Sequence, residues 1–261
     1  MNDPRYQQGL QHLARVAGTN EPAILDALAD IAPDLAHFTV AFGYGDVYAR
    51  PGLTPRQRQL ATIAALAALG NARPQLIFHL HGALNVGCTA TEIIETLIHL
   101  AGYAGFPATL NGIFAAQEAF RAKGIAPQVE TAAPRSTNER YDQGLAALKA
   151  IDGEAGQRVI DSLRDIAPDL GRFIIEFGFG DIYSRPGLDL VTREIVTLSA
   201  LAAMGTASPQ LNVHIHGLLN VGGTRTVLVE TFIHIAVYAG FPAAINAMLT
   251  AKAVLAERDK N

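Results

Sequence analysis

The sequence predicts an all-α protein built from two tandem copies of one helical unit. RYQQGL at Arg5 recurs as RYDQGL at Arg140, and DIAPDL at Asp30 recurs at Asp165, so both pairs share an offset of 135 residues. Ala- and Leu-rich segments end at glycines or begin at prolines, as helices do, and no β-branched run alternates with polar residues. Two copies with large apolar faces are expected to pack about a pseudo-two-fold axis, which creates two similar clefts.

The same offset extends through both copies. It relates FGYGDVYARPGL from Phe42 to FGFGDIYSRPGL from Phe177, and YAGFPATLN from Tyr103 to YAGFPAAIN from Tyr238. Between the copies, residues 124–139 hold two prolines and a polar cluster, which is typical of a linker. We therefore place the first unit at residues 1–125, the linker at 126–137 and the second unit at 138–261.

Each helix expected in the later part of the first unit has a sequence signal at one end. These helices are 58–69, stopped by Gly70; 74–86, begun by Pro74; 89–103, begun by the capping-box spacing of Thr89 and Glu92; and 107–124, begun by Pro107.

Composition narrows the class of protein. Hydrophobic residues make up 49% and charged residues 17%, so apolar surface is expected to cover subunit interfaces as well as the core. The net charge is −4 without a basic stripe, which argues against a nucleic-acid partner. Weakly polar stretches such as 195–205 are too short to cross a bilayer, and the first residues lack a signal pattern. We expect a cytoplasmic protein with no membrane partner.

Two His-x-His pairs are the most visible candidate site residues: His79 and His81, then His214 and His216. In a helix, positions i and i+2 lie about 200° apart, so one pair cannot ligate one ion, and we assign no metal. Both histidines could instead be hydrogen-bonded packing residues. Their retention in two diverged copies favours a shared use, with one His of each pair facing a cleft.

A second set of polar residues recurs at helical spacing. Glu95, His99 and Tyr103 share one face, as do their counterparts Glu230, His234 and Tyr238. Such a Glu–His pair either tunes the histidine for proton transfer or belongs to a buried polar network that orients two helices. The spacing leaves both interpretations open.

Arginines supply the candidate contacts to an anion. Arg50 and Arg185, followed by Arg58 and Arg193, carry the planar donor fork that binds carboxylates. The alternative is that they pair with nearby acids such as Asp46 and Asp181, and for Arg58 a surface position is favoured. Asn85 and Asn220, four residues after His81 and His216, are taken as further substrate contacts. Cys88 corresponds to Gly223, so we interpret it as structural or incidental.

The runs RPGLTPRQRQLATIAALAALG and HLHGALNVGCTATEIIETLIHLAGYAGFPATLN, with their second copies, resemble the carboxymuconolactone decarboxylase family. The resemblance implies an all-α fold like that of the alkylhydroperoxidase relatives. Single-unit members form hexamers built from dimers. A trimer of this duplicated chain would therefore give a pseudo-hexamer.

The superfamily has two chemistries, and the resemblance favours one of them here. The peroxide-reducing branch carries cysteines four and seven residues before the motif histidine. If His79 and His214 are that histidine, these positions hold Gln75, Ala72, Gln210 and Ala207. Without a thiolate there is no peroxide nucleophile, which argues against a thiol peroxidase.

The other branch decarboxylates 4-carboxymuconolactone in aromatic degradation without a cofactor. Loss of CO2 leaves an enolate, which must be stabilised and then protonated on carbon. By resemblance, Arg50 or Arg185 holds a carboxylate and His79 or His214 supplies the proton. His81 and His216, with Glu95 and Glu230, complete the relay. An isomerase acting on a related anionic metabolite and a non-catalytic ligand-binding protein are the alternatives.

One departure predicts that the two clefts differ. Relatives often carry a glutamate after the arginine that begins the first core helix. Glu194 fills that position in the second copy, but Gln59 does so in the first. We therefore count Glu194 among the catalytic candidates and expect one cleft to be active and the other degraded or reassigned.

Overall fold

The computed structural model describes residues 3–128, 131 and 134–260, and all regular structure in that part of the chain is helical. The first unit contains α1 (Pro4–Ala17), α2 (Ala23–Leu28), α3 (Pro33–Phe38), η1 (Thr39–Val47), α4 (Pro55–Leu69), α5 (Arg73–Asn85), α6 (Ala90–His99), η2 (Leu100–Gly102) and α7 (Gly105–Ala122). The second contains α8 (Thr137–Ile151), α9 (Gly153–Ser162), α10 (Pro168–Phe173), η3 (Ile174–Tyr183), α11 (Leu190–Met204), α12 (Ser208–Asn220) and α13 (Arg225–Arg258). Part of the expected linker, residues 129–130 and 132–133, lies outside the described residues.

The predicted helix ends agree closely with the structure. Gly70 ends α4 in the left-handed conformation (φ 70°), and Thr54 begins it with a capping box. The helix expected over 89–103 begins with the predicted Thr89–Glu92 capping box but is α-helical only to His99, where the tighter turn of η2 follows. The all-α, two-copy fold predicted from the repeat is thus confirmed.

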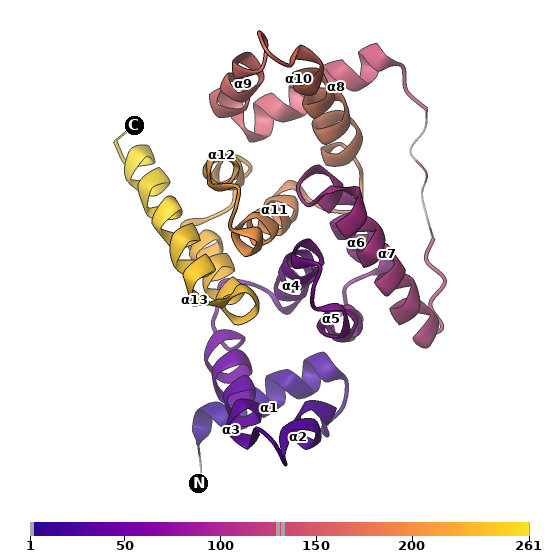
Figure 1. The fold of residues 1–261 in the computed structure, drawn as a ribbon, viewed down its shortest axis with the longest axis vertical. Coiled ribbons are helices and arrows are strands. Elements are labelled where there is room, and N and C mark those ends of the chain that lie inside the picture. Colours follow the sequence, from indigo (N-terminus) through magenta and orange to yellow (C-terminus); the bar gives the residue numbers. More distant parts are fainter. Residues whose placement is uncertain (1–2, 129–130, 132–133, 261) are drawn as a thin grey trace.

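The centre of the molecule is the contact between α4 and α11, one helix from each unit (Figure 1). Both helices are buried over most of their length. Val196 and Ala200 of α11 join the core of the first unit, and Ala61 and Ala65 of α4 join that of the second. The two units therefore share one continuous interior rather than meeting at a polar domain boundary.

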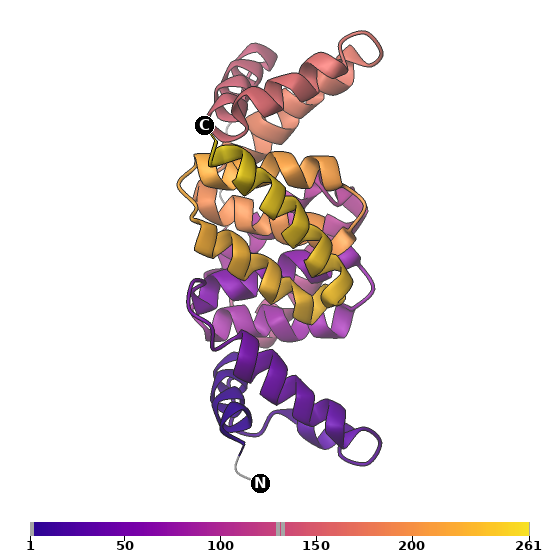
Figure 2. The ribbon, with the colours of Figure 1, turned by 90° about the vertical axis from the view of Figure 1, so that its left-hand side faces the viewer.

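The N-terminal parts of the two units form arms at opposite ends of the molecule (Figure 2). In each arm the first helix crosses a π-helix, α1 against η1 and α8 against η3. Glycines permit that crossing: a Cβ on Gly144 would lie 2.0 Å from the carbonyl oxygen of Ile175, and one on Gly180 would lie 2.4 Å from that of Arg140. The backbones thus approach more closely than any side chain allows.

Ion pairs reach across the two units in a reciprocal way. Arg50 of the first unit binds Glu230 on α13, and Arg185 of the second binds Glu95 on α6. Such a pattern, in which residue i contacts j and the counterpart of j contacts that of i, is the signature of two-fold packing. It supports the predicted pseudo-two-fold relation.

One helix corrects the expectation that no segment is long and apolar enough to cross a membrane. α13 meets that criterion by length and composition. However, core helices of globular proteins meet it too, and α13 is two helices joined at Gly240, whose φ of 85° and ψ of 164° are not helical. It also buries the side chains of Glu230 and His234 against the first unit. One face of α13 therefore packs into the molecule, while 28% of its apolar window as a whole is buried.

The crossing in the second arm gives the first prediction. Gly144→Ala should lower the free energy of unfolding by about 3 kcal/mol or more, because the new methyl group overlaps backbone that cannot move without separating α8 from η3. Gly178→Ala on η3, the other helix of the crossing, is the matched control, since a Cβ there meets nothing within 4 Å. Urea unfolding checks both, and equal stability of the two variants would contradict the close-crossing argument.

Candidate functional site

Two clefts lie between the units, and each takes side chains from both. The first cleft consists of Tyr48, Gln59, Thr62 and His79 of the first unit with Glu230, His234 and Tyr238 of the second. The second cleft consists of Tyr183, Glu194, Thr197 and His214 of the second unit with Glu95, His99 and Tyr103 of the first. The repeat thus places two similar sets of side chains between the units, and a described cavity adjoins the second set.

Local helix geometry explains how the second cleft is assembled. Glu194 and Thr197 are three residues apart on α11 and share a face. The π-helix η3, a rare element that often marks functional sites, ends at Tyr183 and delivers its hydroxyl to them. Sequence reasoning missed Tyr183 and its counterpart Tyr48. Their retention in the GDVYARPGL and GDIYSRPGL segments was the available signal.

A hydrogen-bonded chain joins the two units inside the second cleft. His214 Nδ1 lies 3.0 Å from Glu194 Oε2, and the Tyr183 hydroxyl donates to Glu194 Oε1 at 2.6 Å. That hydroxyl is also 2.7 Å from the hydroxyl of Tyr103, which belongs to the first unit. The Glu194 carboxylate fixes the Nδ1 side of the imidazole, and none of the described residues hydrogen-bonds its Nε2.

Charge sets the protonation state of His214. Burial alone would lower its pKa, but the negative charges of Glu194 and Asp152, with the hydrogen bond that His214 donates to Glu194, raise that pKa to about 9. The imidazole is therefore a cation at neutral pH. Asp152 Oδ1 lies 3.8 Å from His214 Nδ1. Sequence reasoning missed Asp152 as well, although its replacement of Ala17 between the copies was visible.

The first cleft has the same arrangement around its histidine, but with the neutral amide of Gln59 in place of a carboxylate. His79 Nδ1 lies 3.0 Å from Gln59 Oε1, and Gln59 Nε2 donates to the Tyr48 hydroxyl at 3.1 Å. Burial lowers the pKa of His79 to about 3, with no carboxylate to offset it. Because Gln59 accepts through Oε1, the proton of His79 sits on Nδ1 and Nε2 is left as an acceptor. The single difference between Gln59 and Glu194 thus separates the two clefts chemically.

A cavity of about 330 Å³ adjoins His214 and has the size of a small-molecule site. Its polar lining includes His99, Tyr103, Asp152, Tyr183 and His214. The remaining wall is largely apolar: Leu148, Val159, Ile160, Leu170, Phe173, Ile174, Phe177, Phe179 and Ile182. A small ligand there would meet one cationic donor within apolar surroundings.

The candidate arginines are held by glutamates of the opposite unit. Arg185 Nε donates to both oxygens of Glu95 at 3.0 Å, and Arg193, which is fully buried, donates to the same carboxylate at 3.2 Å. Arg50 and Arg58 contact Glu230 in the same way. The alternative of pairing with acids is met by Glu95 and Glu230 and not by the suggested Asp46 and Asp181, which bind Arg5 and Arg140. The surface position favoured for Arg58 is also wrong, because that side chain is buried.

Of the two interpretations left open for Glu95 and His99, the direct Glu–His pair does not form. Glu95 turns to the arginines, while His99 Nε2 lies 2.7 Å from Thr197 Oγ1 and its Nδ1 faces Arg193 at 3.4 Å. Burial, together with the charge of Arg193, holds the pKa of His99 well below its usual value. His234 lies between Arg58 and Thr62 in the first cleft in the same way. These contacts match the alternative interpretation, a buried network that orients helices.

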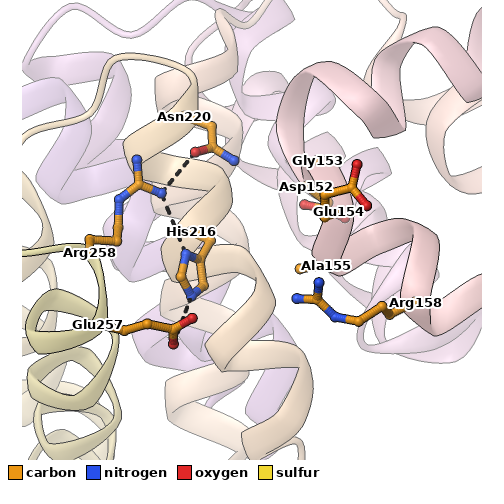
Figure 3. A pocket seen from close by; sticks show the side chains of 9 residues that line it. All are labelled: Asp152, Gly153, Glu154, Ala155, Arg158, His216, Asn220, Glu257 and Arg258. Carbon is orange, nitrogen blue, oxygen red and sulfur yellow. Dashed lines mark hydrogen bonds and ion pairs between the residues drawn. The ribbon is translucent and has the colours of Figure 1, made fainter. Parts of the chain in front are cut away.

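The other histidine of each pair lies outside the clefts, as the helical spacing predicted. His216 lines an outer pocket of about 420 Å³ with Asn220, Glu257 and Arg258 (Figure 3). Asn220 is held there by Ile151 and Arg258, and Asn85 by Val16 and Lys123. His81, like His216, is only half-buried on the outer face of its helix. The structure thus brings His214, but not His216 or Asn220, to the cavity.

Cys88 has no features of a reactive thiol. Its side chain is buried at the end of α5, and burial, reinforced by the nearby Glu92, raises its pKa to about 12.

The sequence of this chain matches one family model and several known proteins. The model of the carboxymuconolactone decarboxylase family matches residues 33–118 and 168–253. The 4-carboxymuconolactone decarboxylase of Acinetobacter baylyi is 40% identical over 130 residues, which cover 49% of this chain and 96% of that protein. The nitrosuccinic acid decarboxylase of Metarhizium robertsii is 32% identical over 112 residues, which cover 42% of this chain and 76% of that protein.

A solved structure supports the fold of the whole duplicated chain. It is a proposed gamma-carboxymuconolactone decarboxylase subunit from Burkholderia xenovorans, with a TM-score of 0.59 and 22% identity. The match covers 97% of this chain and 98% of that one.

The bridges between the units give the second prediction. Glu95→Gln should lower the free energy of unfolding by about 3–5 kcal/mol, because it leaves the buried charge of Arg193 without a carboxylate. Glu118→Gln, which breaks the exposed pair with Arg73, should cost less than about 1 kcal/mol. Chemical denaturation measures both variants. A loss of similar size in each would contradict a special role for the buried bridge.

Proposed function

Because the chain belongs to the carboxymuconolactone decarboxylase family, we propose that it is a cofactor-free decarboxylase of a small carboxylated lactone of the 4-carboxymuconolactone type, in aromatic-compound degradation. Two relatives named as decarboxylases support a carboxy-lyase at the level of the family. The observation that carries the proposal is the placement of His214, whose ring borders a 330 Å³ cavity while the Glu194 carboxylate lies 3.0 Å from its Nδ1. We place turnover in the second cleft.

The proposed reaction uses this cation as a proton donor. As the C–C bond to the carboxylate breaks, its electron pair moves through the ring double bond to the lactone carbonyl, giving CO2 and an enolate. The His214 cation stabilises the negative charge that develops, and its Nε2–H then protonates the ring carbon. Glu194 keeps the ring oriented and compensates its charge. The electron pair of the broken C–C bond ends in the new C–H bond, so the step needs no oxidant or reductant.

Attraction of an anionic substrate is assigned to Arg185 and to Arg193, which contacts the cavity residue His99 but does not itself line the cavity. Arg185 and Arg193 share the single carboxylate of Glu95, so this group keeps a net positive charge. Arg185 binds Glu95 through Nε and Nη2, which leaves its Nη1 outside those bonds. Arg50 and Arg58 are proposed to do the same in the first cleft, where Glu230 is the shared carboxylate.

The neutral His79 favours a second function for the first cleft, which is binding without turnover. Its Nε2 offers a lone pair rather than a proton, so it accepts hydrogen bonds but does not protonate carbon. We propose that this cleft holds a ligand while the second performs the reaction. An isomerase on a related metabolite would use the same donor, His214.

We further propose that three chains associate into a pseudo-hexamer in the cytoplasm. α7 exposes the stripe Phe106, Leu110 and Phe114, and α13 exposes the equivalent Phe241, Ile245 and Leu249, each at least half exposed. Spacing of four residues aligns each stripe along one helix face. Two equivalent apolar faces per chain allow each chain to contact two neighbours, and a ring of three closes that set.

The third prediction tests the proton donor. His214→Gln should lower kcat with 4-carboxymuconolactone by about 100-fold or more, because general-acid catalysis is lost. His79→Gln should leave kcat close to that of the unsubstituted protein. The rate should also fall as the pH rises through about 9, where the cation loses its proton. CO2 release and loss of substrate absorbance give the rates.

Two outcomes would count against this assignment. A loss of less than about tenfold in the double variant His79→Gln/His214→Gln would overturn the proton-donor role. Absence of turnover in the unsubstituted protein would overturn the 4-carboxymuconolactone proposal. A parallel assay with nitrosuccinate, the acid named for the Metarhizium relative, then tests a second small carboxylated substrate.

The fourth prediction concerns assembly. The double variant Phe106→Glu/Phe241→Glu should convert a species of three times the 27.7 kDa chain mass into single chains, because it places charges on both apolar faces. Light scattering after size-exclusion chromatography measures the mass. A single-chain mass for the unsubstituted protein would refute the trimer.

A further inference from the structure

The outer pocket and the cavity of the second cleft share one residue, Asp152, which lines both. Asp152 follows the last residue of α8, where the chain turns at Gly153 (φ 54°) into α9. Asn220 fixes this corner by donating to the carbonyl of Ile151 at 2.8 Å. The carboxylate is therefore held in the wall between the two spaces rather than on a mobile loop.

Two carboxylates converge on His214. Asp152 Oδ1 lies 3.8 Å and Glu194 Oε2 lies 3.0 Å from the same atom, His214 Nδ1. Both also crowd Gly217, one helical turn after His214: a Cβ there would lie 3.2 Å from the Asp152 oxygen and 3.0 Å from the Glu194 oxygen. The glycine leaves the room that the pair of carboxylates occupies.

The Asp152 carboxylate is buried without a conventional partner. Only 6% of the residue is exposed, and among the described residues Oδ1 has no hydrogen bond. A buried carboxylate is costly unless an opposite charge faces it. The cation that faces it inside the wall is His214.

The first unit supplies a comparison without these charges. At the positions of Asp152 and Glu194 it has Ala17 and Gln59, and its histidine, His79, is neutral. The two carboxylates and the cationic histidine thus occur together in one unit and are absent together from the other.

We propose that Asp152 is a positioning residue of the second cleft, whose carboxylate holds the His214 ring in its protonated, proton-donating form from the wall between cleft and outer pocket. The use of the His214 proton in decarboxylation rests on the proposed function; the effect of Asp152 on the protonation of His214 does not. The pKa of His214 agrees with this inference: burial lowers that pKa, and the charges of Glu194 and then Asp152 raise it.

Other charged or titratable groups face these two side chains. His214 is faced by Glu194 on α11, Tyr183 on η3, Tyr103 after η2 and His99 on α6. In the outer pocket, Asp152 is accompanied by Glu154 and Arg158 on α9, His216 on α12, and Glu257 and Arg258 on α13 (Figure 3). Burial raises the pKa of Asp152 to about 6. The ion pair with His214 should therefore be most populated midway between about pH 6 and 9 and weaken towards either limit.

The test is an NMR titration of the histidine rings in the full chain, with the His214 signal assigned by its loss in His214→Gln. In the unsubstituted protein the His214 midpoint should lie near 9. Asp152→Asn, which keeps the shape and removes the charge, should lower it by about one pH unit or more. Glu154→Gln, which removes an outer-pocket carboxylate without touching His214, is the matched control and should leave it in place.

An unchanged midpoint in Asp152→Asn would overturn the inference, as would an equal shift in Glu154→Gln. Should Asp152→Asn not fold, the reverse variants decide: Ala17→Asp/Gln59→Glu should make His79 titrate at a higher pH than Gln59→Glu alone, and equal His79 midpoints in the two variants would refute the idea. The alkaline limb of the pH–rate profile should move down with the Asp152→Asn midpoint. A chain that does not turn over 4-carboxymuconolactone would refute the proposed substrate, and the titration would still decide the role of Asp152.

Discussion

The structure depends on the sharing of one glutamate by two arginines across the two units. Glu95 holds Arg185 and Arg193, and Glu230 holds Arg50 and Arg58. Because Arg193 and Arg58 are almost completely buried, each unit needs a carboxylate of the other to compensate the charge of its arginine. Each cleft can exist only where the units are joined, since the bridging helix also supplies the His and Tyr that complete it. The ion pairs therefore define both the packing of the chain and the location of its candidate chemistry.

Within that frame, one pair of residues decides what each cleft can do. Gln59 and Glu194 make the same contact to the Nδ1 atom of their histidines, both at 3.0 Å. The amide offers only a neutral acceptor, so His79 remains neutral, while the carboxylate compensates a cation and His214 retains its second proton. Two clefts with nearly the same geometry thus have opposite proton-transfer capacity. An acid at position 152 amplifies the difference and does not create it.

The sequence was sufficient for the fold because the repeat, the glycine stops and the capping boxes are local signals. It also predicted that only one histidine of each pair faces a cleft, since residues two apart on a helix face different ways, but not which of the two. The sequence did not predict which side chains contact one another across the two units. It suggested His99, four residues away, as a partner of Glu95, whereas the actual partners, Arg185 and Arg193, lie in the other unit. Helical spacing reports which residues share a face but not which helix covers that face. Asp152 escaped notice for a related reason, because a residue at a helix end belongs to no face pattern.

Duplication within one chain removes a constraint that a symmetric dimer imposes. In a homodimer both clefts must carry the same residue at the position of Gln59 and Glu194, so a carboxylate beside one histidine appears beside both. In the fused chain the two positions are separate residues, and a charge can be introduced in one cleft while the other keeps its neutral contact. Buried charge is costly wherever it is not compensated, so a chain that places Glu194, Asp152 and the His214 cation together confines that cost to one cleft. The neutral cleft preserves the shared core of α4 and α11 and the pairing of Arg58 with Glu230, on which the charged cleft also depends.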